Sequence, residues 1–121
     1  MFQKKNCVIV GGAKGRGSSI VQKYASQNYN IAFMDTDKES GNLLKRKMEK
    51  EYGSNVFFFH GDADSEEDRE LFAGAIIGQY GMVDCLYYRS DIARGAEEIE
   101  LLLKGHLKTE GKVEDFFYRT C

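Results

Sequence analysis

The chain has 121 residues, of which 42% are hydrophobic and 30% are charged, and its formal net charge is −2. This composition is typical of a globular domain, and the length predicts one domain over residues 1–121. The weakly acidic balance gives no basic footprint, so we expect no nucleic-acid partner. No apolar run reaches the roughly 18 residues that a membrane helix needs, so we expect no membrane association.

The sequence contains three cysteines, Cys7, Cys85 and Cys121. An odd number without paired spacing argues against a disulfide framework and fits a reducing compartment. Cys7 and Cys85 lie within apolar runs, so we expect both to be buried free thiols. The first residues lead directly into an apolar stretch and leave no room for a signal peptide. We therefore expect a cytoplasmic protein.

Short apolar segments alternate with segments of helical periodicity along the chain. In chain order we expect a strand at 6–10, a helix at 18–27, a strand at 30–35, a helix at 37–52, a strand at 55–60, a helix at 65–80, a strand at 82–88 and a helix at 96–107. The strands are apolar at nearly every position, as in a sheet that is buried on both faces. Residues 112–118 fit either a last strand or a docked tail.

Alternating strands and helices predict a parallel sheet covered by helices on both faces, which is a Rossmann-like three-layer α/β/α sandwich. Right-handed crossovers favour the strand order 3-2-1-4, with a possible short fifth strand from the C-terminal tail. Ligands of such sheets bind where the strand order reverses. Here that point directly follows the first strand, residues 6–10.

A glycine-rich loop lies at that point, in the segment GGAKGRGS at residues 11–18. Glycines permit a tight turn and let a phosphate approach the backbone. A helix that starts near Gly17 would direct free N–H groups and its positive end toward that anion. The spacing is GxxxGxG and lacks the last glycine of GxGxxG. Ser18 stands where a P-loop needs lysine, so we do not expect nucleoside triphosphate hydrolysis.

The second strand ends in Asp35, 18 residues after Gly17, and Thr36 follows it. An acid at this position accepts hydrogen bonds from both ribose hydroxyls of an adenosine and repels a 2′-phosphate, which favours NAD(H) over NADP(H). Lys14 favours NADP(H) instead, since a cation in the loop can contact a 2′-phosphate. We give Asp35 more weight because it faces the ribose. The structural alternative is a glycine loop with a capping aspartate and no ligand.

These motifs resemble the short-chain dehydrogenase/reductase family over residues 4 to about 92. The segment VGGAKGRG at 10–17 matches the family's TGxxxGxG, Asp35 matches the acid after its second strand, and Asp62–Ala63 resembles the Asp-Val pair that touches the adenine ring. The resemblance implies a Rossmann-like fold and a bound dinucleotide. The residues expected to hold it are Gly11, Gly12, Lys14, Gly15, Arg16, Gly17, Asp35, Thr36, Asp62, Ala63 and Arg89.

The sequence departs from the family pattern in the cofactor region. Arg16 replaces a small apolar residue and could either reach the diphosphate or block the nicotinamide side. YRSD at 88–91 stands where the family has NNAG. There, Tyr88 and Asp91 place larger side chains where the family leaves room for the cofactor, whereas Arg89 could pair with a phosphate. Alternatively, the tyrosines at this strand end simply pack on a neighbouring element.

The family's chemistry uses a tyrosine with a lysine four residues later, and none of the seven tyrosines has one. We therefore expect no catalytic residue. His60 lies near Asp62 and Asp64, but no third ligand has suitable spacing, so we expect no metal site.

The resemblance therefore implies a degenerate, truncated cofactor-binding half that acts as a non-catalytic or regulatory NAD(H)-binding module. Two alternatives remain open. One is an NAD(P)-dependent oxidoreductase that a partner chain or unusual residues complete. The other is an interaction protein that has lost its cofactor.

A sheet that ends at the fourth strand would leave an apolar edge, which favours association. We therefore expect a homo-oligomer that uses the edge of residues 82–88 or the helix at 96–107 with the tail.

Overall fold

The computed structural model describes residues 4–116. The strands are β1 (Asn6–Val10), β2 (Asn30–Asp35), β3 (Val56–His60), β4 (Val83–Arg89) and β5 (Leu107–Phe116). The helices are α1 (Gly15–Ser26), α2 (Lys38–Tyr52), α3 (Glu66–Tyr80) and α4 (Ala93–Leu102), and a 3-10 turn at Ser90–Ile92 precedes α4. None of these helices is both long and apolar enough to cross a membrane.

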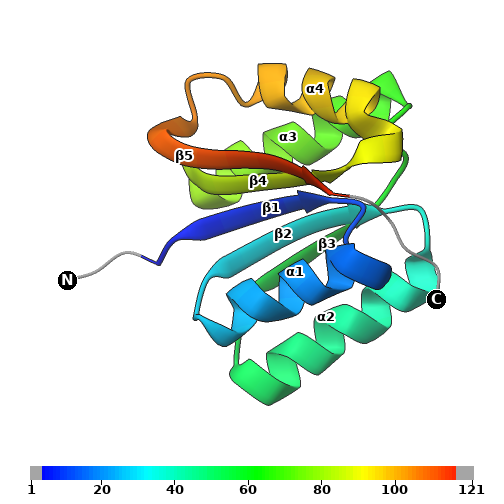
Figure 1. Ribbon diagram of the computed structural model, residues 1–121, viewed down its shortest axis with the longest axis vertical. Coiled ribbons are helices and arrows are strands. Elements are labelled where there is room, and N and C mark those ends of the chain that lie inside the picture. The colour runs from blue at the N-terminus through cyan, green and yellow to red at the C-terminus, as the bar shows by residue number, and fades with distance from the viewer. Residues whose placement is uncertain (1–3, 117–121) are drawn as a thin grey trace.

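All five strands are parallel and form one sheet in the order β3-β2-β1-β4-β5. Helices α1 and α2 lie on one face of the sheet, and α3 and α4 lie on the other (Figure 1). Side chains of β1 alternate between the two resulting cores. Cys7 and Ile9 belong to the α1/α2 side, whereas Val8 and Val10 belong to the α3/α4 side. The predicted three-layer Rossmann-like sandwich is confirmed.

Helices α2 and α3 begin and end at residues that suit those positions. The Asp37 carboxylate accepts a hydrogen bond from Ser40 N–H, and the Ser65 hydroxyl accepts one from Asp68 N–H. Each bond satisfies an amide that the first helical turn leaves without a backbone partner. Gly53 ends α2 in the left-handed conformation, with φ of +64°.

The helix predicted at 96–107 is displaced in the structure. Helix α4 begins at Ala93 and ends at Leu102, so the prediction is wrong for residues 103–107. Gly105 turns the chain with φ of +92°. The His106 ring nitrogen Nδ1 lies 2.8 Å from the Gly81 carbonyl oxygen and fixes the turn against the end of α3. Leu107, which fits the helical periodicity, therefore enters a strand. Helix α1 also begins earlier than predicted, at Gly15.

The possible fifth strand is present and is longer than expected. Strand β5 pairs in parallel with β4, with an irregularity between Val83 and Cys85. The predicted segment 112–118 extends past it, and residues 117 and 118 lie outside the described part of the chain. Because β5 covers β4 within the same chain, the expectation of a bare β4 edge is wrong. Association through α4 and the tail stays a prediction.

Candidate functional site

The turn after β1 is held directly against the end of β2. Gly11 N–H and Gly12 N–H both donate to the Met34 carbonyl oxygen, at 2.8 and 3.3 Å. Gly11 has φ of +92°, a backbone conformation that residues with a side chain rarely adopt. The bend that these bonds create leads the chain from the sheet into α1.

Gly17 lies in the first turn of α1, directly over the Gly11 turn. A Cβ atom at Gly17 would collide with the Gly11 carbonyl oxygen, so only glycine allows this approach. Gly15, the first residue of α1, has φ of +58°. Each glycine of the GxxxGxG motif is thus required by the backbone, either for a positive φ or for a close approach.

Asp35 ties the glycine loop to the end of β2. Its side chain is buried, with 7% of the residue surface exposed. Oxygen Oδ2 accepts a hydrogen bond from Ala13 N–H at 3.0 Å, and Oδ1 accepts one from Asp37 N–H at 2.9 Å. Asp35 therefore anchors the loop, as the structural alternative of a capping aspartate predicted.

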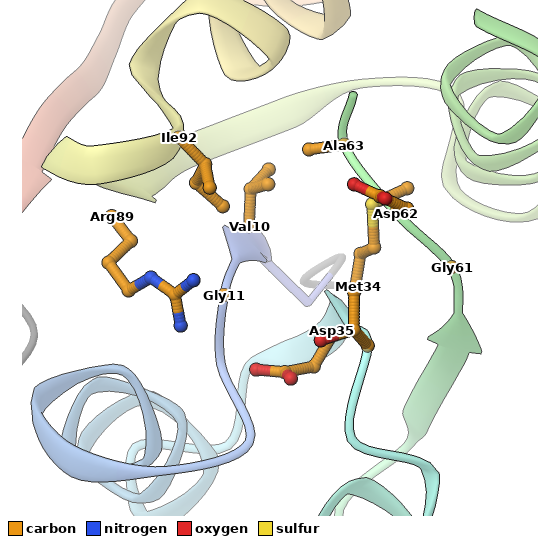
Figure 2. A pocket seen from close by; sticks show the side chains of 10 residues that line it. Val10, Gly11, Met34, Asp35, Gly61, Asp62, Ala63, Arg89 and Ile92 are labelled. Atoms are coloured by element: carbon orange, nitrogen blue, oxygen red, sulfur yellow. The ribbon is translucent and has the colours of Figure 1, made fainter. Parts of the chain in front are cut away.

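A cavity of about 30 Å³ lies between the Gly11 turn and the ends of β2, β3 and β4. Six predicted binding residues line it: Gly11, Asp35, Thr36, Asp62, Ala63 and Arg89. Figure 2 shows Arg89 on one side of the Gly11 backbone and Asp35 on the other. Four lining residues were missed by the sequence: Val10, Met34, Gly61 and Ile92. The cavity is far smaller than the ~300 Å³ of an ordinary ligand pocket.

The basic residues of the glycine loop face away from this cavity. The Lys14 Nζ atom lies 3.1 Å from Asp37 Oδ2. The Ser40 N–H bond and this lysine lower the pKa of the Asp37 carboxyl to about 2. Arg16 lines a separate hollow beside Tyr24 and Tyr87. Gly12, Gly15 and Gly17 shape the loop without lining the cavity.

The end of β4 and the 3-10 turn after it meet the cavity through other side chains than the sequence suggested. Tyr88 packs against the core on the α3/α4 side and does not line the cavity. The Asp91 side chain is 62% exposed and accepts a bond from Arg89 Nε at 2.6 Å. Ile92 lines the cavity in place of both. The Arg89 and Ile92 side chains are therefore the groups that restrict the space beside Gly11.

His60 ends β3, and its Nε2 atom lies 3.1 Å from the Thr36 carbonyl oxygen. Within residues 4–116, no three His, Cys, Asp or Glu side chains lie close enough together to hold a metal ion.

A parallel sheet of this order, with a glycine turn after β1 and an acid at the end of β2, defines a Rossmann-like nucleotide-binding domain. The model of the short chain dehydrogenase family matches residues 5–104. The chain therefore belongs to the short-chain dehydrogenase family, whose members bind a nicotinamide dinucleotide.

Curated relatives match part of this chain, and solved structures share its fold. L-fucose dehydrogenase of Mus musculus is 26% identical over 85 residues, which cover 70% of this chain and 29% of that enzyme. A 3-oxoacyl-[acyl-carrier protein] reductase from Brucella melitensis superposes with a TM-score of 0.79 at 16% identity, over 95% of this chain and 57% of that one. L-sorbose reductase from Gluconobacter frateurii, solved with NADPH and L-sorbose, superposes with a TM-score of 0.66 at 20% identity, over 71% and 33%. The chain spans about a third of the length of the first of these.

Proposed function

We propose that these 121 residues form an NAD(H)-binding module that does not transfer hydride by itself. The observation that carries the proposal is the position of Asp35. Its carboxylate lines the cavity at the end of β2, and backbone N–H groups from two sides hold it in place. A carboxylate fixed there can accept both hydroxyls of the adenosine ribose and repels a 2′-phosphate.

The start of α1 supports a diphosphate site next to Asp35. Lys14 is its N-cap residue, its side chain has no acceptor atom for the first-turn amides, and no acid lies in that turn. The neighbouring helices α2 and α3 are capped by Asp37 and Ser65 instead. An uncapped helix N-terminus behind a glycine turn suits an anion.

Arg89 would then serve as a binding residue rather than as a block. Its Cβ atom would lie 3.1 Å from a Cβ built on Gly11, so its stem runs along the glycine turn. We propose that the guanidinium exchanges Asp91 for the diphosphate when the nucleotide enters. This movement also enlarges the cavity, which in its present shape is too small for an adenosine.

Calorimetric titration with NAD⁺, NADH, NADP⁺ and ADP-ribose tests the proposal. We expect NAD⁺, NADH and ADP-ribose to bind with Kd on the order of 1–100 μM, and NADP⁺ to bind about tenfold more weakly. Arg89→Ala is expected to weaken NAD⁺ binding about tenfold, because the diphosphate loses a charged partner. Glu98→Ala, on the exposed side of α4, is the control that should change nothing. Absence of binding by all four ligands would contradict the proposal and favour an interaction protein.

The chain alone is expected to give no turnover. No tyrosine in the sequence is followed by lysine at the fourth position, so the pair that donates the proton in this family is absent from these residues. NADH absorbance, followed at high protein concentration with a panel of aldehydes and ketones, checks this. Protein-dependent NADH oxidation would favour the alternative of an oxidoreductase that uses unusual residues.

A further inference from the structure

Two free cysteines lie side by side in the centre of the sheet, on β1 and β4. Cys7 is in register with Cys85, and both side chains belong to the core on the α1/α2 side. Neighbouring strands are about 4.7–4.9 Å apart, which falls within the roughly 4.4–6.8 Å between Cα atoms that a disulfide spans. The pair can therefore form a disulfide without separation of the two strands.

The two thiols differ in their access to solvent. Both residues are buried, but Cys7 has no exposed surface, whereas Cys85 is 7% exposed and lines a hollow of about 270 Å³. The hollow is also lined by Lys5, Lys108 and Lys112. Lys108 pairs with Asp84 at 2.9 Å and Lys112 pairs with Glu114 at 3.2 Å, so the charges are partly balanced. Cys85 therefore has a shorter path to solvent than Cys7, and a small neutral reagent needs only a local opening at this hollow to reach it.

The two thiols also differ in ionisation. Burial raises the pKa of Cys7 well above its usual value. A hydrogen bond from Cys7 is the main cause that lowers the pKa of Cys85 to about 7, and the Tyr24 hydroxyl adds to it against the opposing effect of burial. A thiolate is the reactive form of cysteine. Cys85 is the attacking thiol of the pair, and Cys7 is the neighbour that supplies the second sulfur.

We infer that Cys85 and Cys7 form an oxidation site for small hydroperoxides, and that the product is a disulfide between β1 and β4. In the first step the Cys85 thiolate attacks the terminal peroxide oxygen, the O–O bond breaks, and an alkoxide or hydroxide leaves and takes up a proton. In the second step Cys7 attacks the sulfur of the resulting sulfenic acid, the S–S bond forms and water leaves. Two thiols and one hydroperoxide thus give a disulfide, an alcohol or water, and a further water.

Hydrogen peroxide is the probe, and Cys121→Ser is the parent chain, so that only the two sheet cysteines remain. We expect folded parent to lose both thiols and the mass of two hydrogen atoms, to stay a single chain, and to recover both thiols with dithiothreitol. Peptide mapping should join the segments that contain Cys7 and Cys85. This measurement needs no substitution in the core. A disulfide between chains, or thiols that persist when peroxide has fully oxidised free glutathione, would overturn the inference.

Two further variants separate the roles of the thiols. In Cys7→Ser, Cys85 should react within about threefold of the parent rate but stop at a sulfenic acid that dimedone traps. In Cys85→Ser, Cys7 should react at least about tenfold more slowly. Equal rates in the two variants would overturn the assigned order of attack. Circular dichroism checks that each variant is folded. If the hydroxyl of Cys7→Ser unfolds the core, Cys7→Ala is used for the sulfenic acid trap alone, because it removes the hydrogen bond that lowers the pKa of Cys85 and is expected to react more slowly.

Discussion

Gly17→Ala is expected to lower the free energy of unfolding by about 2–3 kcal/mol and to abolish nucleotide binding. The added Cβ would collide with the Gly11 carbonyl oxygen, which belongs to the backbone and cannot rotate away. Either α1 or the Gly11 turn must therefore move. The same movement displaces the two amides that bond to Met34 and thereby opens the loop beside Asp35. Urea unfolding and the NAD⁺ titration measure the two effects.

Gly74→Ala is the matched control. Gly74 lies in the middle of α3, and a Cβ atom there meets nothing within 4 Å. Alanine in the interior of an exposed helix stabilises by about 0.5–1 kcal/mol relative to glycine. The two substitutions should therefore change stability in opposite directions. If Gly17→Ala is as stable as Gly74→Ala, the close approach of α1 to the Gly11 turn is not what requires glycine.

Much of the fold follows from local sequence patterns, namely short apolar runs for the strands and capping residues for the helices. The strands are short runs of apolar residues bounded by glycine or polar residues, and the helices α2 and α3 carry recognisable caps. The end of α4 does not follow from such a pattern, because LLLKGHLK continues the helical periodicity through Leu107. The turn at Gly105 depends on the contact of His106 with Gly81, which is 25 residues away in sequence. Helix periodicity and capping residues depend on neighbours in sequence, so they do not predict such a contact.

The position of the candidate site in the backbone was predictable from the sequence, but the directions of its side chains were not. Glycine spacing and the acid after β2 located the turn and the cavity. The direction of a side chain depends on its partner in the folded chain, so Lys14 pairs with Asp37 instead of facing the cavity. Ile92 was missed for a related reason. An apolar residue after a strand gives no sign that the following 3-10 turn will bring it back to Gly11.

Asp35→Asn is expected to reduce the preference for NAD⁺ over NADP⁺ about tenfold, while Asp35→Ala is expected to destabilise the fold and to release the loop. Alanine would leave the buried Ala13 N–H and the partly buried Asp37 N–H without an acceptor, which lowers the free energy of unfolding by about 2–3 kcal/mol. Asparagine keeps the shape and one acceptor oxygen, so one of the two anchoring bonds remains, and it removes the charge that repels a 2′-phosphate. The asparagine variant therefore tests the choice of cofactor with part of the anchoring kept, whereas alanine removes both at once.

The control for Asp35→Asn is Asp84→Asn, which makes the same chemical change at the opposite end of the sheet. The Asp84 carboxylate accepts a bond from Asn6 N–H at 2.8 Å and lies beside Lys108, away from the cavity. We expect this variant to lose stability without any change in the ratio of the two Kd values. If both variants lower stability and neither changes the ratio, Asp35 is an anchor of the loop alone. The choice between NAD(H) and NADP(H) would then depend on other residues, and Lys14 would be the first to test, after release from Asp37, because a cation in the loop can meet a 2′-phosphate.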